Sequence, residues 1–424
     1  MSKRIILLTQ WFQPEPNPRG IVFARELVKR GYEVEVITGF PNYPGGKVYP
    51  GYKIKLLQRE LVDGVQITRL PLYPSHGGSA VKRLFNYLSF ALSATVYGVL
   101  FAKKADMMHV YQPPGVSAAL IRLFRRIPVV YDVQDMWPDT LAATGMVRSE
   151  RLLKVVYGIC QWVFRTVDKI SVLSPGFKRL LIERGVPSEK IEVIYNWCDE
   201  AALTAPVGGV PKAFPTDDKF NLLFAGTMGK AQALDGVIAA AEIVQAKQPN
   251  VNFVFVGGGI EVDRLKQLVQ SKHLQNVVFI PKVPMDEVGA MLQQADVLLV
   301  HLKNDPLFSM TVPSKLQAYL AVGKPILMAV TGDSSAIVDE SKCGLSAIPE
   351  DPQSIADAVI QLSQYSSTEL QAMGQRGKDF YHREMALDVG VNSFEQILTE
   401  LPGGSLPSNS SQLKLREIVR VERT

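Results

Sequence analysis

Short apolar runs rich in β-branched residues alternate with longer amphipathic stretches along the whole chain. In the first half these runs begin at Ile5, Glu33, Met107, Val129, Ile170 and Ile191. In the second half they begin at Asn221, Asn252, Asn276, Val297 and Pro325. Strands separated by helical segments are typical of parallel sheets whose strands are joined by crossover helices. The pattern therefore predicts an α/β protein with one sheet in each half.

The two halves are separated by residues 205–218, which read APVGGVPKAFPTDD. This stretch is rich in Pro and Gly and has no apolar periodicity, which is the composition of a linker. A chain of 424 residues also exceeds the size at which one hydrophobic core keeps growing. We therefore expect a first domain over 1–204 and a second over 219–386. A last helix is expected over 387–401, followed by a mobile tail over 402–424 that begins as a polar, low-complexity segment.

The composition is that of an ordinary globular protein, with 47% hydrophobic and 21% charged residues. The net charge of +5 is compatible with phosphate-bearing ligands, anionic lipid or nucleic acid and does not choose among them. Three cysteines without C-x-x-C spacing argue against a disulfide framework and indicate a reducing compartment. Five histidines show no metal-ligand spacing, so we expect no metal. The first apolar run is too short for a signal peptide, and we expect a cytoplasmic protein.

A glycine-bearing turn follows the apolar run at Asn221 and precedes a helix that should begin near Leu234. Small residues let the backbone come close to a ligand, and a helix N-terminus offers unpaired N–H groups to a phosphate. A plain strand-to-helix turn of any α/β protein explains the same residues equally well. The candidate diphosphate contacts here are Gly226, Thr227, Met228, Gly229 and Lys230.

Two further turns lie in the second half. The turn at Gly257 lacks the G-x-G-x-x-G spacing and an acidic partner, which disfavours a nicotinamide cofactor. In the other turn, Ser314 is placed to cap a helix that begins near Lys315, and Lys315 would neutralise a departing diphosphate. A capped surface helix with a solvated lysine is the alternative. The residues that lead into this helix are Thr311, Val312 and Pro313.

The first half has its own candidate ligand edge. Arg19 and Gly20 follow the first strand at the start of a helix, and the strand at Val129 ends close to Asp132, Asp135 and Trp137. Ligands of open α/β folds bind at the carboxyl ends of parallel strands, and carboxylates suit sugar hydroxyls. Two alternatives stay open: Asp135 caps the loop before a proline, and Asp132 is buried and structural.

Two helices have surfaces that suit a membrane. Residues 84–102 are almost uncharged and are bracketed by Lys82, Arg83, Lys103 and Lys104. Their length permits a spanning helix, but their position between strands favours a peripheral helix that is partly core and partly lipid-facing. Residues 151–168 form a basic, aromatic amphipathic helix that would lie on anionic lipid. Ordinary crossover helices packed on a sheet explain both patterns equally well.

Several motifs occur together: the early Pro- and Gly-bearing loop before FARELVKRGYEVEVIT, then YDVQDMWPD, VIYNWCD, LLFAGTMG followed by ALD, and VPSKLQAYLAVGKPI. As a set they resemble glycosyltransferase family 4, in particular the bacterial surface-polysaccharide enzymes of the fucosaminyltransferase and colanic-acid type. The resemblance covers about 3–401. It implies the GT-B fold, in which two Rossmann-like domains with parallel sheets face each other across a cleft. The last helix would cross back to the N-terminal domain.

The resemblance also implies a function. It suggests retaining, metal-independent transfer of a sugar, such as N-acetylfucosamine, from a nucleotide diphosphate, with UDP preferred. The acceptor would be a lipid-linked glycan of O-antigen, capsule or exopolysaccharide synthesis at the anionic inner face of the plasma membrane. No nucleic acid and no cofactor besides the donor are implied. By position, Gly226 to Lys230 would hold the diphosphate, and Ser314 and Lys315 would assist. Gly257, Thr311, Val312 and Pro313 would also contact the donor, and Lys282 and Val283 would meet the base. Asp135 and Gly20 would face the acceptor and the transferred sugar.

The chain also departs from the family pattern. Many members carry two glutamates eight residues apart, and here the corresponding positions are Met310 and Ala318. The histidine often found in the N-terminal motif corresponds to Gln134. Two other functions therefore stay open at this point: a nucleotide-sugar epimerase of the same architecture, and a non-catalytic membrane-docked assembly factor.

Overall fold

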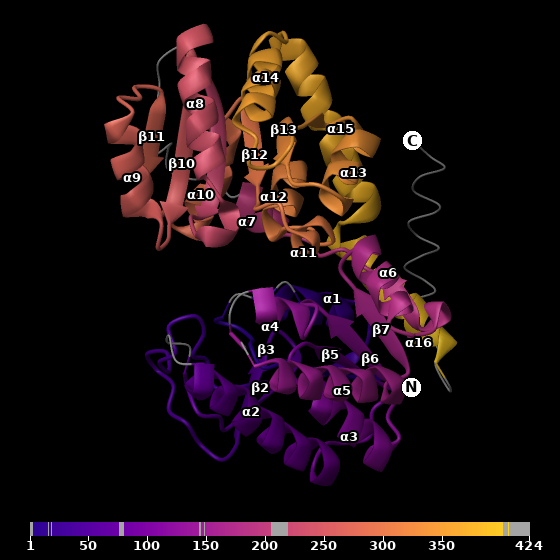
Figure 1. Cartoon of the computed structure of the whole chain (residues 1–424). Coiled ribbons are helices and arrows are strands. Elements are labelled where there is room, and N and C mark those ends of the chain that lie inside the picture. Colours follow the sequence, from indigo (N-terminus) through magenta and orange to yellow (C-terminus); the bar gives the residue numbers. More distant parts are fainter. Residues whose placement is uncertain are drawn as a thin grey trace, which may run out of the picture. The chain divides into compact units, whose positions relative to one another are not determined.

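The computed structural model describes residues 3–15, 17, 19–75, 80–143, 146–147, 149–204, 219–401 and 406. It divides into two compact units (Figure 1). Unit 1 comprises Met1–Leu173, Phe177–Ile194 and Gly390–Thr424, and unit 2 comprises Ser174–Gly176 and Tyr195–Val389. Each unit is an α/β fold with a single sheet, as the sequence predicts.

Unit 1 is built on a sheet of eight strands in the order β3-β4-β2-β1-β5-β6-β7-β8. Strands β1 and β6 are buried along their whole length, because helices cover both faces of the sheet. Its elements are β1 (Arg4–Leu8), α1 (Ile21–Lys29), β2 (Glu33–Gly39), β3 (Gln58–Val62), β4 (Val65–Leu70), α2 (Ala80–Leu100), β5 (Met107–Tyr111), α3 (Gly115–Arg125), β6 (Val129–Val133), α4 (Asp139–Ala143), α5 (Glu150–Thr166), β7 (Lys169–Val172), α6 (Pro175–Glu183), η1 (Ser188–Lys190), β8 (Ile191–Val193) and α16 (Leu387–Glu400).

One edge of this sheet differs from the all-parallel arrangement that the sequence predicts. Strands β3 and β4, which the apolar pattern did not indicate, pair antiparallel. The turn between them consists of Asp63 and Gly64, both with positive φ, as the two-residue turns of hairpins require. Every residue of β3 is at least partly exposed, so the strand lacks the apolar run that reveals a buried strand.

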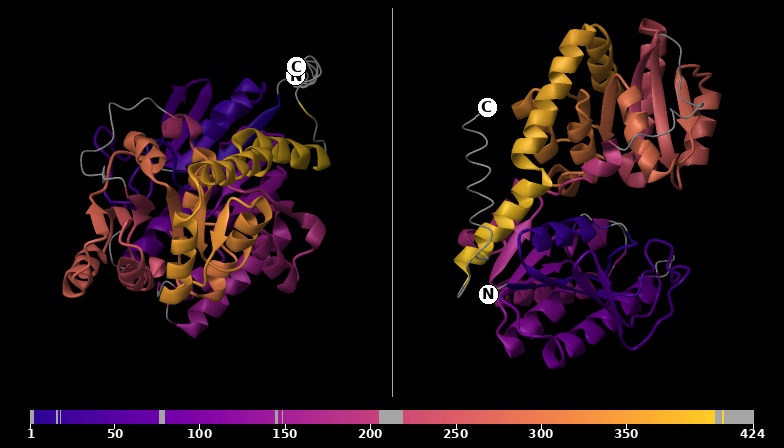
Figure 2. Two further views of the ribbon diagram at one scale, coloured as in Figure 1. Left: turned by 90° about the horizontal axis from the view of Figure 1, so that it is seen from above. Right: turned by 180° about the vertical axis from the view of Figure 1, so that it is seen from behind.

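The last helix belongs to unit 1, which confirms the crossing back that the fold class implies. Figure 2 shows α16 alongside the strands of this unit. The Phe394 ring lies 5.2 Å from that of Phe23 on α1, measured between ring centres. The buried Glu395 accepts hydrogen bonds from Arg30 at 2.8 Å and from Tyr32 at 3.1 Å. Aromatic packing and a half-buried ion pair thus fix the helix on unit 1.

Unit 2 contains a fully parallel sheet of six strands in the order β11-β10-β9-β12-β13-β14. This is the strand order of dinucleotide-binding folds, whose ligand crevice lies where the order reverses, here between β9 and β12. Its elements are α7 (Glu200–Thr204), β9 (Phe220–Thr227), η2 (Lys230–Gln232), α8 (Asp235–Lys247), β10 (Val251–Gly258), α9 (Val262–Ser271), β11 (Val277–Ile280), α10 (Met285–Gln294), β12 (Val297–His301), α11 (Pro306–Ser309), α12 (Ser314–Val322), β13 (Ile326–Ala329), α13 (Asp333–Ser341), β14 (Gly344–Ser346), α14 (Pro352–Ser363) and α15 (Ser367–Glu384).

The division between the units falls earlier than the sequence suggests. Residues 195–204, expected in the first domain, belong to unit 2 because α7 packs on α10 and α12. The segment before α7 is also fixed there, since the Cys198 thiol lies 3.2 Å from the hydroxyl of Tyr381 on α15. The expected linker at 205–218 lies outside the described residues, as does nearly all of the expected tail at 402–424.

The two helices with membrane-like surfaces are present as α2 and α5, close to their predicted bounds. Within the described ranges, no helix combines the length and the apolar character that crossing a bilayer requires. A peripheral position on a membrane stays a prediction.

Candidate functional site

The carboxyl end of β9 in unit 2 carries the first predicted glycine. Gly226 pairs with Gly257 on β10, and both have positive φ, which a side chain would strain. A Cβ placed on Gly257 would lie 2.0 Å from the Gly226 carbonyl oxygen. Gly257 is therefore required for the close approach of the two strands, while Gly226 itself is exposed at the end of β9.

Lys315 of α12 reaches this same strand end. Its Nζ atom lies 3.6 Å from the centre of the Phe224 ring on β9, and it would lie 3.4 Å from a Cβ on Gly226. The two turns that the sequence analysis singled out are thus neighbours, at the point where ligands of this strand order bind.

The Lys315 ammonium is buried and has no hydrogen-bond partner among the described residues. Burial lowers the pKa of Lys315 to about 7, because leaving water disfavours the charged form. A buried amine without an anionic partner is costly, and groups of this kind concentrate at functional sites. An anionic ligand at Gly226 would supply the missing partner.

The start of α12 differs from the prediction. The helix begins at Ser314 itself, its N-cap is Pro313, and no side chain caps it. Ser314 was expected to be the cap, but it is the first helical residue and its side chain is exposed. The first amides of α12 therefore have no capping side chain, which leaves a partial positive charge beside Lys315.

Four of the predicted donor contacts pack or hydrogen-bond within the protein, and their roles toward a donor stay predictions. The Met228 amide donates to Gly258 at 2.8 Å, and the Met228 side chain is buried in the core. The Gly229 amide donates to the side chain of Gln232 at 3.0 Å. Thr311 uses its hydroxyl, which donates to Leu307, and Val312 is buried. The exposed groups on the first turn are those of Gly226, Thr227 and Lys230.

Lys230 lies at a different opening. It starts the short helix η2 and lines a cavity of about 410 Å³ together with Lys303 and Glu350. Helix α8 starts only after η2, and its first residue Asp235 is paired with Arg264 at 2.6 Å. The start of α8 therefore already has a negative charge. Among the described residues, the lining of this cavity includes Lys230 but not Lys315.

Three residues that the sequence analysis missed shape this site. Phe224 supplies the ring under the Lys315 ammonium. The Tyr319 hydroxyl accepts from the Ala225 amide at 2.9 Å and fixes β9 to α12. His301, at the end of β12, lies 2.7 Å from the Gln232 carbonyl and accepts from the Glu350 amide at 3.1 Å. A buried Phe or Tyr in a strand or helix gives no sequence signal that distinguishes it from core.

The loop after β11 contains Lys282 and Val283, the predicted base contacts. Lys282 is exposed and Val283 half-buried, at the same sheet edge as Gly226 because the strands are parallel. Within the described part of the chain, no hydrogen bond or ion pair joins them to Lys315, Phe224 or Gly226, so their role stays a prediction. Among the described residues, no group of three or more His, Cys, Asp or Glu side chains is placed to hold a metal ion.

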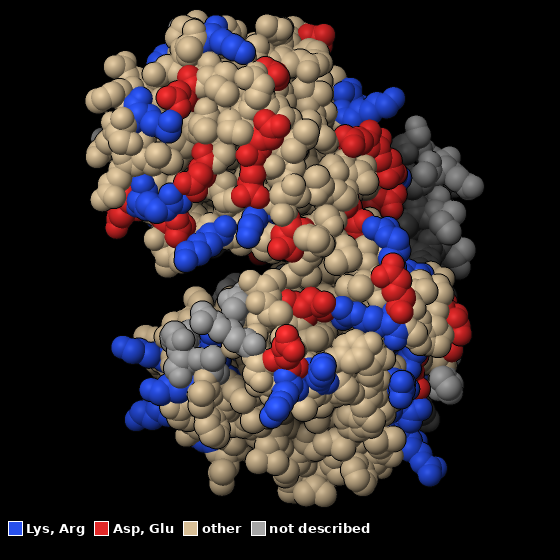
Figure 3. Space-filling view, viewed as in Figure 1, with Lys and Arg blue, Asp and Glu red and all other residues tan. Residues whose placement is uncertain are grey.

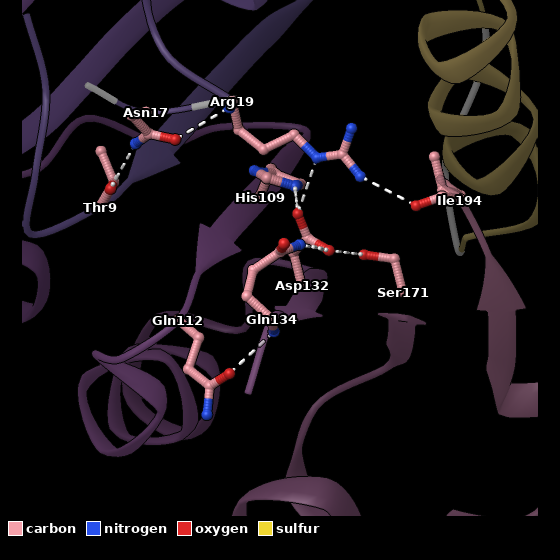
Figure 4. Close-up of polar contacts among 9 residues, drawn as sticks. All are labelled: Thr9, Asn17, Arg19, His109, Gln112, Asp132, Gln134, Ser171 and Ile194. Atoms are coloured by element: carbon pink, nitrogen blue, oxygen red, sulfur yellow. Dashed lines mark hydrogen bonds and ion pairs between the residues drawn. The ribbon is translucent and has the colours of Figure 1, made fainter. Parts of the chain in front are cut away.

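In unit 1, Arg19 and Asp132 form a fully buried ion pair, at 2.9 Å between Nε and Oδ2 (Figure 4). The second oxygen of Asp132 accepts from Ser171 and from Gln134, both at 2.9 Å. Arg19 also donates to the Ile194 carbonyl at 3.1 Å. The His109 Nε2 atom lies 3.5 Å from Asp132, too far for a good hydrogen bond.

This cluster corrects two of the predicted acceptor contacts. Burial alone would raise the pKa of Asp132, but Arg19 and His109 together outweigh burial and hold that pKa at about 2. Both side chains spend their polar atoms on the protein interior, so Arg19 and Asp132 are structural. Gly20 caps α1 and approaches Asn17 so closely that a Cβ would lie 2.8 Å from the Asn17 carbonyl.

Asp135 is the exposed carboxylate at this edge. Gln112 holds its loop by accepting from the amides of Gln134 and Asp135 and donating to the Asp135 carbonyl. No hydrogen bond to the carboxylate itself is found in the described part of the chain. Loss of hydration on partial burial raises the pKa of Asp135. The residue nevertheless lines a cavity. Trp137 lies beside it, with its ring 5.9 Å from that of Tyr87.

That cavity, of about 310 Å³, lies between α2, the start of α3, α4 and α5. Its walls are mainly aliphatic and aromatic, and the charged and amide side chains in its lining are Gln10, Arg83, Gln112 and Asp135. Its size is within the range of small-molecule sites.

Comparison with known families identifies the chain. Residues 22–197 match the model described as a glycosyl transferase 4-like domain, and residues 211–380 match the glycosyl transferases group 1. The chain belongs to glycosyltransferase family 4.

Relatives of this family 4 glycosyltransferase carry related descriptions. It is 29% identical over 311 residues to the putative colanic acid biosynthesis glycosyl transferase WcaI of Escherichia coli, covering 70% of this chain and 75% of that protein. It is 24% identical to the probable glycosyltransferase WbjE of Pseudomonas aeruginosa, covering 56% of this chain and 60% of that protein.

Solved structures show the same GT-B fold. Sucrose-phosphate synthase from Thermosynechococcus elongatus aligns with a TM-score of 0.70 at 17% identity, over 95% of this chain and all of that one. Anabaena HepE in complex with UDP-glucose aligns with a TM-score of 0.65 at 14% identity, over 94% of this chain and all of that one.

The departures from the family pattern have a local explanation in unit 2. The Met310 carbonyl accepts from the Ser174 hydroxyl at 2.5 Å, and a Cβ on Gly176 would lie 2.8 Å from that of Met310. Met310 thus packs against the backbone of Ser174–Gly176. Gln134, at the position of the common histidine, donates to Asp132 rather than pointing to a ligand edge.

Proposed function

We propose that this family 4 glycosyltransferase transfers a sugar, with retention of configuration and without a metal, from a nucleotide diphosphate to a lipid-linked glycan. The observation that carries the proposal is the buried, unpaired Lys315 ammonium beside Gly226 at the strand-order reversal of unit 2. A diphosphate is the ligand whose charge matches this position. UDP is the proposed nucleotide, in keeping with UDP-glucose in the complex of HepE, which shares the fold.

The residues of unit 2 would act on the leaving group. As the sugar bond breaks, negative charge accumulates on the diphosphate, and a preorganised ammonium with free helix amides lowers the energy of that state. Lys315 and the start of α12 supply both. In this proposal the departing phosphate accepts the proton of the acceptor hydroxyl, so no separate protein base is needed.

Unit 1 would act on the acceptor. Asp135 offers carboxylate oxygens without a hydrogen-bond donor in the described residues, and Trp137 presents an apolar ring beside it. Sugar hydroxyls and the apolar face of a sugar ring suit this pair. The relatives named for colanic acid biosynthesis support surface-polysaccharide synthesis as the pathway class. The transferred sugar is proposed to be an N-acetylated deoxyhexosamine, and the place of action the inner face of the plasma membrane.

The test is a donor panel. The full chain is incubated with radiolabelled UDP- and dTDP-sugars, with and without a membrane extract that contains lipid-linked glycans, and products are separated by solubility. Transfer predicts label in the lipid fraction only when the extract is present. Conversion of the donor in its absence would instead favour an epimerase. Failure to bind any nucleotide sugar by calorimetry would leave the non-catalytic assembly factor.

A further inference from the structure

The cavity in unit 1 is not explained by sugar recognition. A sugar needs many hydrogen-bonding partners, yet the walls that α2 and α5 contribute are made of side chains such as Leu84, Leu88, Val156 and Val163. Empty apolar cavities of this size cost stability, and a polar ligand would lose its hydration here without compensation. The lining is suited to a hydrocarbon.

The cavity is continuous with the exposed apolar surface of the same helices. Leu84 and Leu88 of α2 line it and are still 48% and 55% exposed, and Leu152 and Ile159 of α5 are both 42% exposed. In Figure 3 the surface over these helices is largely uncharged, with Lys and Arg side chains along its borders. A chain that leaves a membrane could enter the cavity without crossing water.

The polar lining of the cavity carries opposite charges that do not neutralise each other. Arg83 lines the cavity, and its buried Nε has no hydrogen-bond partner in the part of the chain that the structure describes. No ion pair joins it to Asp135 within that part. A guanidinium without a carboxylate partner suits a phosphate. The cavity therefore offers a site for an anionic headgroup on an apolar chain.

We propose that this cavity binds the isoprenoid-like chain of the lipid-linked acceptor, with the acceptor phosphate at Arg83 and its sugar end at Asp135 and Trp137. The inference rests on the proposed function and deepens it, because it assigns the apolar part of the acceptor to one site. It also gives the exposed faces of α2 and α5 a purpose beyond contact with a bilayer. The cavity would then select acceptors by the chain as well as by the sugar.

The probe is farnesyl phosphate, titrated into the full chain by calorimetry without any nucleotide sugar. We expect one molecule to bind per chain. Ala91→Phe places a ring inside the cavity and should weaken binding at least tenfold. The matched control is Leu92→Phe on the same helix, because Leu92 is 68% exposed and does not line the cavity; its binding should stay within twofold. Cys160 lies on α5, which forms the opposite wall of the cavity. Cys160→Phe should therefore weaken binding as Ala91→Phe does.

The charge is tested in the same assay. Arg83→Gln should weaken the binding of farnesyl phosphate at least fivefold and leave the binding of farnesol unchanged. Lys103 is exposed and lies outside the cavity, so Lys103→Gln should change neither affinity. Thermal melts of each variant check that the fold is intact.

Three results would overturn the inference. The Ala91→Phe and Leu92→Phe variants would bind farnesyl phosphate equally well, or inorganic phosphate would bind with the same affinity as farnesyl phosphate and displace it. In the third, the protein would bind only vesicles of anionic lipid, and both Phe variants would bind them alike. The last would mean that the surface contacts a bilayer and the cavity holds no chain. Transfer to a water-soluble acceptor without a chain separates this from the proposed function. If the wild type does not transfer a sugar to that acceptor, the proposed function is refuted, while the farnesyl phosphate titrations still test the cavity.

Discussion

The Nζ atom of Lys315 lies 3.6 Å from the centre of the Phe224 ring, in the interior of unit 2. The ring face favours the charged amine, but burial outweighs it and lowers the pKa of Lys315 to about 7. Close to neutral pH the amine is therefore about half protonated. Burying this amine destabilises the protein without ligand, and an anionic ligand would supply the charge partner that the amine lacks.

Replacing Lys315 by Met should lower turnover with the native donor by about 100-fold or more, because a preorganised charge at the leaving group is removed. The melting temperature should stay the same or rise, since the variant no longer buries an unpaired amine. The control is Lys266→Met, whose amine lies 6.0 Å from the Phe279 ring but is exposed. Wild-type turnover of the Lys315 variant would remove Lys315 from the mechanism.

The lowered pKa also predicts a pH dependence of donor binding. Only the protonated amine attracts a diphosphate, so affinity for a nucleotide sugar should be highest below pH 7 and fall by up to tenfold per pH unit above it. Calorimetry in buffers of different ionisation heat should show proton uptake near pH 7. A nucleotide sugar is the right ligand, because free UDP has a terminal phosphate with a pKa near 6 of its own. The Lys315→Met variant should lose both effects.

In the protein without ligand, the lowered pKa of Lys315 makes stability rise with pH, whereas it makes donor affinity fall. Between pH 7 and 10.5, the ordinary pKa of a lysine, the unfolded chain binds a proton at Lys315 that the folded chain does not. The contribution of this residue to the free energy of unfolding therefore rises with pH in that window. Urea titrations of the wild type and of Lys315→Met should differ in this slope; identical slopes would mean that the amine is not shifted in the folded protein.

The sequence predicts the parts of the fold that depend on local pattern. Buried parallel strands are continuous apolar runs, so β1 and β9 were found within a residue or two of their ends. Strand β3 was missed because it lies at an exposed edge, and β14 because none of its three residues is buried. The order of the strands in each sheet is a property of long-range pairing and has no local signal.

The site was predictable where one local motif fixes the geometry. The turns at Gly226 and Ser314 were expected to meet, and Lys315 does reach Gly226. The pairing of Arg19 with Asp132 joins positions 113 residues apart, and no periodicity reveals it. The role of Ser314 as a cap was wrong because Pro313 takes that position. The Met228 amide pairs with the neighbouring strand, so its contact with a donor stays a prediction.

His301 should hold the turn that carries Lys230. It is buried, its pKa is lowered by burial, and it bridges the Gln232 carbonyl and the Glu350 amide. His301→Phe keeps the ring volume but leaves both groups without a partner, which costs about 2–4 kcal/mol. Chemical denaturation would measure the loss, and amide exchange should rise at residues 229–233. Unchanged exchange there would show that the turn is held by other contacts. His382→Phe, near the end of α15 on the exposed side, is the control.

Asp132 and Asp135 lie three residues apart and should respond oppositely to the same substitution. Asp132→Asn removes the charge that compensates buried Arg19, and uncompensated buried charges cost about 3–5 kcal/mol, so the free energy of unfolding should fall by that amount. Asp132 has a lowered pKa of about 2, so its stabilisation is present above 3.8, the ordinary pKa of an aspartate, and is lost as pH falls toward 2. Asp135 has a raised pKa, and its ionisation on raising the pH destabilises the fold. Asp135→Asn should therefore leave stability at pH 7 unchanged or higher, while acceptor-dependent transfer falls by about 10-fold or more.

Denaturation curves and transfer rates of the two variants, measured side by side, decide the assignment: a stable Asp132→Asn with poor transfer, together with an unstable Asp135→Asn, would exchange the two roles.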